Sequence, residues 1–429
     1  MPISRYLKIY PDKSRAGHVI LYSTKKGSSV RLPEKLLAAA LDDTLSDNNR
    51  QTLTRLGMYV DDPVLEQREM SALVKRTNSR STLFRGTAVL NLECNLACSY
   101  CYEEGFREGQ RMSASVAESL VDWVVTNHLE HGRDVEMQFY GGEPLLSLPL
   151  VHSISRQLQD EAANRGRKFS ITMTTNGTLL TRAVVQQLLQ YNFTKAILTL
   201  DGPKSVHDIQ RPYVSGKGSF DTIVTNIKDV CDLVRIDLGG NYTQDNYRQY
   251  PLLLDYLLEE GITPEKLGLV HFSPVTPKSG AGVDISAGCI SSSEPWIIAA
   301  VPYLEGEIMA KGFKTSKLTM SACVIEFDHD LVINYDGTLY KCPAFMGWSE
   351  LSVGTLAEGI SDYSESHRLG IWQNDECMEC PYLPLCFGGC RLNPLLQTGS
   401  ISGLDCRRDF FDATLETLVL QNLHKKATS

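Results

Sequence analysis

Three cysteines lie close together in the run Cys94-Asn-Leu-Ala-Cys98-Ser-Tyr-Cys101. Three thiolates in one tight loop can bind three irons of a [4Fe–4S] cluster and leave the fourth iron without a protein ligand. That fourth iron is then available to a further ligand. A zinc half-site is the alternative chemistry for three such thiolates.

A second group of cysteines lies toward the C-terminus. Its members are Cys323, Cys342, Cys377, Cys380, Cys386, Cys390 and Cys406. The two groups hold ten of the 12 cysteines, and only Cys231 and Cys289 stand apart. We expect a cytoplasmic protein, in which thiols stay reduced, so the spacing favours metal or cluster ligation over disulfides. A double zinc ribbon is the alternative use of these pairs.

Glycine-rich and polar motifs follow the cysteine loop in order along the chain. Gly141 and Gly142 let a ligand approach the backbone closely, and the next residue, Glu143, can accept hydrogen bonds from an ammonium group. The run Thr174-Thr175-Asn176-Gly177-Thr178 supplies short polar side chains suited to ribose hydroxyls. Asp201 ends a later strand, and Arg211 is suited to bidentate binding of a carboxylate.

Alternating strand and helix patterns position these motifs. Polar or glycine residues follow six apolar runs that we expect to be strands, and helical stretches separate the runs. The expected strands are Thr87–Glu93, Val135–Tyr140, Phe169–Thr175, Lys195–Leu200, Arg235–Gly240 and Leu267–Phe272. Such repeats predict an α/β fold with a partial (β/α)6 TIM-like barrel, whose chemistry lies on the loops after the strands.

Other segments flank this barrel, which we place at residues 83–290. Residues 1–75 read as a small unit of three strands and two helices, and residues 70–83 read as a polar linker. A linking helix is expected at 291–314, followed by a cysteine-rich domain at 315–429.

Composition limits the classes of function. The chain has 429 residues and a formal net charge of -9, which argues against nucleic acid as the main partner. Its longest apolar stretch is about half a membrane span, so we expect no membrane partner. The segment from Arg5 to Lys35 is different, because it holds eight Lys and Arg against two acidic residues. That local excess indicates an acidic partner or, alternatively, a solvated charged face.

The cysteine loop and the motifs behind it together resemble the radical S-adenosylmethionine (SAM) superfamily. Its fingerprint is the Cys-x3-Cys-x2-Cys spacing with an aromatic residue before the last cysteine, matched here by Tyr100. In that family SAM chelates the open iron, and its cleavage gives a 5′-deoxyadenosyl radical that abstracts hydrogen from the substrate. The resemblance covers about residues 85–275. It implies SAM contacts by Tyr100, Gly141, Gly142, Glu143, Thr175, Asn176, Asp201 and Arg211.

The C-terminal cysteines resemble the SPASM domain, an extension that binds two auxiliary [4Fe–4S] clusters in peptide and protein maturases. This resemblance implies three [4Fe–4S] clusters in total. It assigns Cys323, Cys342 and Cys390 to the first auxiliary cluster, and Cys377, Cys380, Cys386 and Cys406 to the second. The first set is one ligand short, and Cys289 or a thiol of the substrate could complete it.

The element order of residues 1–75 resembles a winged-helix peptide-recognition element, which implies binding of a leader peptide. Together the resemblances indicate a maturase of cysteine-rich ribosomal peptides, of the geopeptide type. They imply thioether crosslinking of a precursor peptide, with an external reductant such as flavodoxin or ferredoxin. Carbon–carbon crosslinking is one alternative.

Two further alternatives stay open. An anaerobic sulfatase maturase forms formylglycine, and such enzymes carry an Asp directly after the cysteine that matches Cys342. Here that residue is Pro343. The remaining alternative is an electron carrier or scaffold without enzymatic activity.

Overall fold

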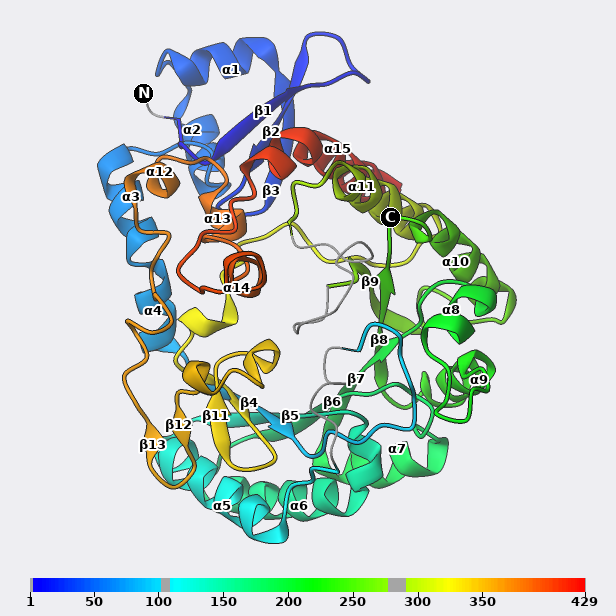
Figure 1. The fold of residues 1–429 in the computed structure, drawn as a ribbon. Helices are drawn as coiled ribbons and strands as arrows, with labels where there is room; N and C mark the ends of the chain where they lie inside the picture. Colours follow the sequence, from blue (N-terminus) through cyan, green and yellow to red (C-terminus); the bar gives the residue numbers. More distant parts are fainter. Residues whose placement is uncertain (1–2, 102–108, 277–290, 429) are drawn as a thin grey trace.

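The computed structural model describes residues 3–101, 109–276 and 291–428, and Figure 1 shows its fold. The strands form two sheets, a three-stranded sheet near the N-terminus and a ten-stranded sheet through the body of the molecule. Within the described ranges, no helix is both long enough and apolar enough to cross a membrane.

Six parallel strands of the larger sheet form the expected partial barrel. They are β4 (Leu83–Val89), β5 (Asp134–Tyr140), β6 (Phe169–Thr174), β7 (Phe193–Thr199), β8 (Arg235–Tyr242) and β9 (Leu267–Pro274). Each strand pairs with the next one in chain order. This arrangement confirms the prediction of an α/β fold of the TIM-like type.

Helices cover the outside of these strands, along the lower and right rim in Figure 1. They are α5 (Ala114–Val124), α6 (Leu148–Asn164), α7 (Arg182–Leu188), α8 (Lys204–Gln210), α9 (Phe220–Val230) and α10 (Tyr250–Glu259). Local sequence explains where two of them begin, because Ser113 and Thr181 accept hydrogen bonds from the first-turn N–H groups of Val116 and Val184. The apolar stripes of the helices and the strands form one continuous core.

The C-terminal domain continues the barrel sheet. Its strand β10 (Asp330–Ile333) pairs in parallel with β4, the first strand of the barrel. Strands β11 (Thr338–Tyr340), β12 (Gly354–Thr355) and β13 (Gly359–Ile360) then extend the sheet in antiparallel fashion. The remaining helices are α11 (Pro295–Ala310), α12 (Asp375–Met378), α13 (Leu383–Cys386), α14 (Leu392–Thr398) and α15 (Arg408–Thr428).

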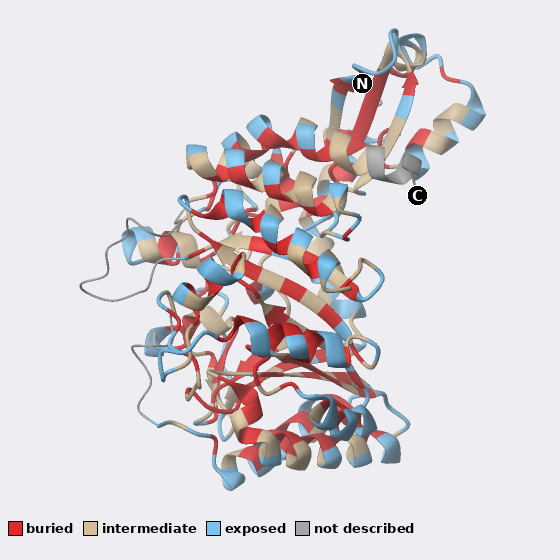
Figure 2. Ribbon diagram, turned by 90° about the vertical axis from the view of Figure 1, so that its right-hand side faces the viewer, coloured by how far each residue is buried: buried red, intermediate tan, exposed pale blue. Residues whose placement is uncertain are grey.

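The N-terminal unit consists of β1 (Leu7–Pro11), β2 (His18–Ser23) and β3 (Ser28–Pro33), followed by α1 (Glu34–Leu41) and α2 (Asp47–Arg55). The central strand of this sheet, β2, is buried on both faces, whereas β1 and β3 each keep exposed residues (Figure 2). Leu21 on one face packs with residues of α1 and α2, whereas Ile20 and Tyr22 on the other face join the main core. The backbone of β3 pairs only with β2 among the described strands, so β3 forms an outer edge.

Two sequence-based boundaries are wrong. The polar segment expected as a linker at 70–83 is mostly helical, because α3 (Pro63–Ser71) and α4 (Leu73–Arg80) occupy it. Asp62 caps α3 by accepting hydrogen bonds from the N–H groups of Val64 and Leu65, and this cap was the missed signal. The first barrel strand begins at Leu83 rather than Thr87, because its register with β5 starts there.

Candidate active site

The three-cysteine loop is anchored to the segment that follows α8. The backbone N–H of Ala97 donates to the carbonyl of Pro212 over 2.8 Å, and that of Ser99 donates to the carbonyl of Gln210 over 3.0 Å. In return, the N–H of Val214 donates to the carbonyl of Asn95 over 3.0 Å. These bonds hold the loop across the carboxyl ends of the barrel strands.

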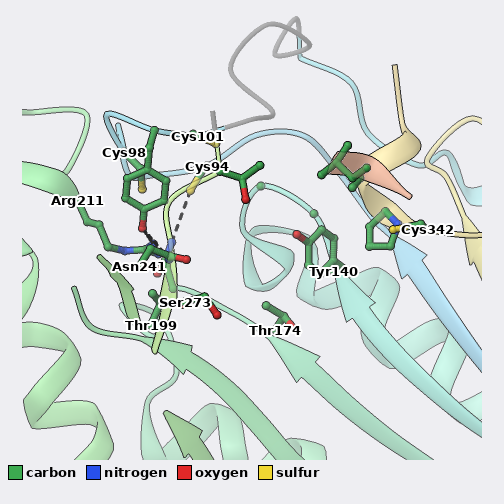
Figure 3. Close-up of a pocket in the computed structure, with 18 of the residues that line it drawn as sticks. Cys94, Cys98, Cys101, Tyr140, Thr174, Thr199, Arg211, Asn241, Ser273 and Cys342 are labelled. Atoms are coloured by element: carbon green, nitrogen blue, oxygen red, sulfur yellow. Dashed lines mark hydrogen bonds between the residues drawn. The ribbon is translucent and has the colours of Figure 1, made fainter. Parts of the chain in front are cut away.

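A cavity of about 440 Å³ lies over those strand ends. Cys94, Cys98 and Cys101 line one part of it, and Cys342 of the C-terminal domain lines another (Figure 3). Its other lining residues are Tyr100, Tyr140, Gly141, Gly142, Thr174, Thr175, Asn176, Thr199, Arg211, Asn241, Ser273, Pro274, Thr276, Pro343, Ala344, Trp348, Leu392 and Leu396. One chamber therefore joins the three-cysteine loop to the cysteine-rich domain.

The two glycines of the first motif lie where side chains would collide with the loop. A Cβ atom on Gly141 would lie 2.2 Å from the carbonyl oxygen of Asn91, and one on Gly142 would lie 2.3 Å from that of Glu93. Gly141 also has a φ of 133°, a conformation that L side chains rarely adopt. Glycine is thus required here for the close approach of two strand-end loops, as well as for access to the cavity.

Glu143 does not line the cavity. Its side chain is fully buried, and its carboxylate accepts hydrogen bonds from the Thr175 hydroxyl over 2.8 Å, the Asn176 N–H over 2.8 Å and the Leu145 N–H over 3.0 Å. Burial raises the pKa of Glu143, and the two N–H donors offset part of that rise. The carboxylate of Glu143 therefore braces the loops after β5 and β6 against each other.

Asn176 connects this brace to the cysteine loop. Its side-chain amide donates to the side-chain oxygen Oδ1 of Asn95 over 2.8 Å and reaches the Cys94 sulfur at 3.6 Å. Asn95 in turn donates to the Thr178 hydroxyl over 2.8 Å. Hydrogen bonds from this motif thus orient the first cysteine, while Thr175 and Asn176 face the cavity.

Tyr100, Asp201, Arg211 and Asn241 form a buried network at the other end of the cavity. The Tyr100 hydroxyl donates to Asp201 and accepts from Arg211 over 2.7 Å and from Asn241 over 3.0 Å. Arg211 Nη1 lies 3.9 Å from the Asp201 carboxylate. Burial raises the pKa of Asp201, and the guanidinium of Arg211 counteracts that rise. Asp201 itself lies behind the lining and supports Tyr100 and Arg211.

Arg211 retains binding capacity toward the cavity. Its Nε atom is buried and has no hydrogen-bond partner among the described residues. A buried guanidinium N–H without a partner is costly, so an anionic group in the cavity would satisfy it. This feature fits the carboxylate of SAM, which sequence reasoning assigned to Arg211.

The C-terminal cysteines gather in two places. Cys323 and Cys390 both lie near Cys342 on the cavity wall, and burial, with a smaller contribution from these neighbours, raises the pKa of the Cys342 thiol to about 12. A thiol with so high a pKa ionises at neutral pH only next to a strong positive charge, which cluster irons supply. The fourth candidate ligand, Cys289, lies outside the described residues.

Cys377, Cys380, Cys386 and Cys406 together line a separate small cavity. The structure thus brings together the same two sets that the resemblance suggested. No three His, Cys, Asp or Glu side chains in the described ranges converge on a point that one metal ion could occupy. That finding concerns single ions, whereas each cysteine of a [4Fe–4S] site binds a different iron.

Several cavity residues escaped sequence reasoning. Thr199, Asn241 and Ser273 lie at or near the carboxyl ends of β7, β8 and β9, so their position after an apolar run was a usable signal. Trp348 and Leu396 approach from the C-terminal domain, and no local pattern in the sequence places them beside the barrel.

Comparison with known proteins agrees with this geometry. Residues 90–247 match the family model described as the radical SAM superfamily. The chain therefore contains a radical SAM domain, the class that the three-cysteine loop and the cavity over the strand ends define. An uncharacterised protein of Methanocaldococcus jannaschii is 31% identical over 131 residues, which is 43% of its own length.

Two longer matches extend beyond this domain. The cysteine-type anaerobic sulfatase-maturating enzyme of Clostridium perfringens is 23% identical over 336 residues, 70% of this chain and 86% of the relative. The serine-type enzyme of Bacteroides thetaiotaomicron is 25% identical over 347 residues, 71% of this chain and 81% of the relative. This chain is thus similar in sequence to anaerobic sulfatase maturases over 70–71% of its length.

Solved structures show the same fold. A structure of anSMEcpe with bound AdoMet matches 79% of this chain and 100% of its own, with a TM-score of 0.62 and 19% identity. The structure of Streptococcus suis SuiB bound to its precursor peptide SuiA matches 94% of this chain and 98% of its own, with a TM-score of 0.54 and 17% identity. The second match spans the N-terminal part of the chain as well.

Proposed function

We propose that this protein is a radical SAM peptide maturase that installs thioether crosslinks in a ribosomally synthesised precursor peptide. The observation that carries the proposal is the shared cavity, in which Cys342 faces the same space as Cys94, Cys98 and Cys101. A ligand of an auxiliary cluster beside the radical site would give the second electron of an oxidation a nearby acceptor. The structure of SuiB, which matches 94% of this chain, was solved with its precursor peptide SuiA.

Each thioether crosslink would be a two-electron oxidation of the peptide. The cluster on the three-cysteine loop, when bound, supplies the electron that cleaves SAM into methionine and a 5′-deoxyadenosyl radical. One C–H and one S–H bond of the peptide break and one S–C bond forms, so two hydrogens leave the peptide. The hydrogen atom of the C–H bond passes to the 5′-deoxyadenosyl radical and gives 5′-deoxyadenosine. The thiol proton goes to solvent, and a cluster held by Cys323, Cys342 and Cys390 would accept the remaining electron. Arg211 and Asn176 orient SAM, while Trp348 and Leu396 shield the reacting carbon from water.

The three-cysteine set near Cys342 supports sulfur chemistry in particular. Cys323, Cys342 and Cys390 leave one ligand position of a four-iron cluster unassigned. A peptide thiolate at that position would hold the sulfur beside the carbon radical. Carbon–carbon crosslinking uses the same barrel residues but gives this position no role.

An anaerobic sulfatase maturase is the second candidate, because two such enzymes align over more than four-fifths of their length. Formation of formylglycine requires a base near the substrate side chain. Pro343 lies on the cavity wall beside Cys342, where such enzymes carry an aspartate, and the cavity lining among the described residues includes no carboxylate. This lining favours activation of a thiol by iron over activation by a carboxylate.

We further propose that the leader of the precursor pairs with the outer edge of β3, because the main-chain groups of an edge strand can pair with an added strand. Ion pairs within the fold already neutralise part of the basic excess of this unit. The excess therefore supports selection of an acidic leader less than the sequence suggested. Arg5 pairs with Glu379 over 2.7 Å, and Lys13 pairs with Glu416 over 3.1 Å. Both of these glutamates lie in the C-terminal domain. Lys25 pairs with Glu66 over 2.6 Å within the N-terminal unit itself.

The decisive experiment uses a cysteine-rich peptide encoded beside the gene, incubated anaerobically with enzyme, SAM and reduced flavodoxin. Thioether formation predicts a loss of two hydrogens per crosslink and cysteines that resist alkylation, with sulfur–carbon connectivity in the fragment spectrum. A product in which a single cysteine has become an aldehyde would identify a sulfatase-type maturase instead. Crosslinks that leave every cysteine open to alkylation would indicate carbon–carbon chemistry.

The leader site is tested separately by hydrogen exchange. Addition of the leader peptide should slow exchange in residues 28–33 of β3 and leave residues 7–11 of β1 unchanged. Protection of β1 without β3 would contradict the strand-edge site.

A further inference from the structure

The loop that carries three cysteines of the C-terminal four-cysteine site is held in place by the N-terminal unit. Residues 377–386 contain Cys377, Cys380 and Cys386, and they form α12, α13 and the turn between them. Figure 1 shows these short helices directly beside the N-terminal sheet. Every contact described below joins residues that are more than 350 positions apart in the sequence.

Polar contacts fix the backbone of this loop. The Arg5 guanidinium donates to the Met378 carbonyl over 3.0 Å, and the Thr24 hydroxyl lies 2.7 Å from the Pro381 carbonyl. Both carbonyls neighbour a cluster cysteine in sequence. Lys8 donates to the Tyr382 hydroxyl over 2.7 Å, and its ammonium lies 4.4 Å from the centre of the Tyr382 ring. Tyr382 lines the four-cysteine cavity.

An apolar contact completes this interface. Tyr6 is fully buried, in one cluster with Trp372, Met378, Leu383 and Phe387. Full burial of an aromatic ring removes about 150–250 Å² from water, so this contact ties the unit firmly to the loop. The N-terminal unit is therefore a wall of the cysteine-rich domain and not a tethered appendage.

We infer that Arg5, Lys8 and Thr24 are positioning residues for the second auxiliary cluster, so that docking of the N-terminal unit keeps this cluster bound and sets its potential. This inference rests on the proposed function and on a cluster bound by the four cysteines, as the resemblance to the SPASM domain implies. Outer partners that orient ligands typically change metal affinity by about 10–100-fold. Arg5 is already paired with Glu379, whereas the Lys8 ammonium contacts Tyr382 of the ligand loop. Positive charge near a negatively charged cluster stabilises its reduced form and so raises its reduction potential.

The consequence concerns regulation. A leader peptide that binds β3 would join the same small sheet that contacts residues 377–386. Those contacts come from Lys8 of β1 and from Thr24 in the turn after β2. Occupancy of the leader site can therefore alter the environment of a cluster that does not line the radical cavity.

The test compares wild-type protein with the double variant Arg5→Ala/Lys8→Ala and the matched control Arg15→Ala/Lys35→Ala, whose side chains are exposed on the same unit. Iron content, electron paramagnetic resonance and the midpoint potential of each cluster are measured after anaerobic reconstitution. We expect the first variant to fall from about twelve irons to about eight, or to keep twelve with a lowered potential for one auxiliary cluster. Its uncoupled cleavage of SAM should match wild type, as should all properties of the control.

Unchanged iron content and unchanged potentials in Arg5→Ala/Lys8→Ala would overturn the inference while leaving the proposed function intact. An equal loss in the control variant would overturn it as well, because the effect would then not arise from the interface. Wild-type protein that binds only about eight irons or fewer would contradict the cluster assignment itself, and the inference would fall with it.

Discussion

The three-cysteine loop and the four-cysteine site are supported in opposite ways. Cys94, Cys98 and Cys101 are held by loops of the same barrel, all within residues 91–241, and most of their supports carry recognisable motifs. Cys377, Cys380 and Cys386 are held by residues at the far end of the chain. The ligands of both sites are visible as a spacing pattern. The second site has a local support as well, since Asn374 accepts a hydrogen bond from the Cys377 N–H, but it depends in addition on residues more than 350 positions away.

The largest effect should follow from changing the three-cysteine loop. Replacing Cys94, Cys98 and Cys101 together by Ala should remove about four irons and all cleavage of SAM, because no other described cysteine except Cys342 lines the cavity. The auxiliary clusters should remain, since their ligands are elsewhere. Deoxyadenosine production by this variant, measured by liquid chromatography, would disprove the assignment of the radical site.

Deletion of residues 1–75 tests whether the four-cysteine site depends on the N-terminal unit. We expect loss of leader-dependent modification and also loss of the second auxiliary cluster, because Tyr6 and Arg5 leave the ligand loop. Uncoupled SAM cleavage should persist within a few-fold of wild type. A deletion protein with about twelve irons and normal peptide turnover would show that neither function depends on the unit.

A smaller effect is expected from Asp201→Asn. The substitution removes the negative charge beside Arg211 and weakens the Tyr100 hydrogen bond without altering the cysteine loop. We expect SAM to bind about 10–100-fold more weakly, about 1.4–2.8 kcal/mol, with normal iron content. Asp237→Asn on β8 is the control, because its partners are Arg235 and the Leu269 N–H, outside the cavity lining. Equal SAM affinity in the two variants would remove Asp201 from the network.

The smallest effect concerns pH. His207 braces the radical site, accepting from the Asp201 N–H over 3.1 Å and contacting the Ser219 hydroxyl over 3.0 Å. Burial lowers its pKa to about 3, below its value in the unfolded chain. Unfolded protein therefore binds the proton first, and stability falls as pH drops below about 6.5, by about 1.4 kcal/mol at pH 5.5.

His128 provides the comparison for this pH effect. Its pKa is likewise lowered to about 3 by burial, but its ring stacks on Phe84 and neither nitrogen has a partner among the described residues. His128→Phe should recover about 1.4 kcal/mol of the loss between pH 7.5 and 5.5, measured by urea unfolding. The contribution of His207 should remain in this variant. Recovery of the whole acid-induced loss of stability would show that His128 alone accounts for it.

Sequence patterns predicted the barrel well because strand periodicity and strand-end motifs are local. Asn176 and Arg211 lie where those motifs suggested, on the cavity. The sequence could not show whether the side chain of Glu143 faces the cavity or the interior, because a carboxylate after two glycines fits either position. The partners of Arg5 and Lys8 were invisible for a different reason: charge counting in a segment cannot show which cations are already paired across the fold.

The parallel pairing of β10 with β4 has a mechanical consequence. Backbone hydrogen bonds between Asp330–Ile333 and Arg85–Ala88 join the C-terminal domain to the barrel, so no hinge can separate the two without breaking that ladder. The spacing between the wall that carries Cys342 and the strand ends is consequently built into the sheet. If clusters occupy both walls as proposed, electron transfer between them should proceed at one fixed tunnelling distance, with a single-exponential rate that does not wait for domain closure.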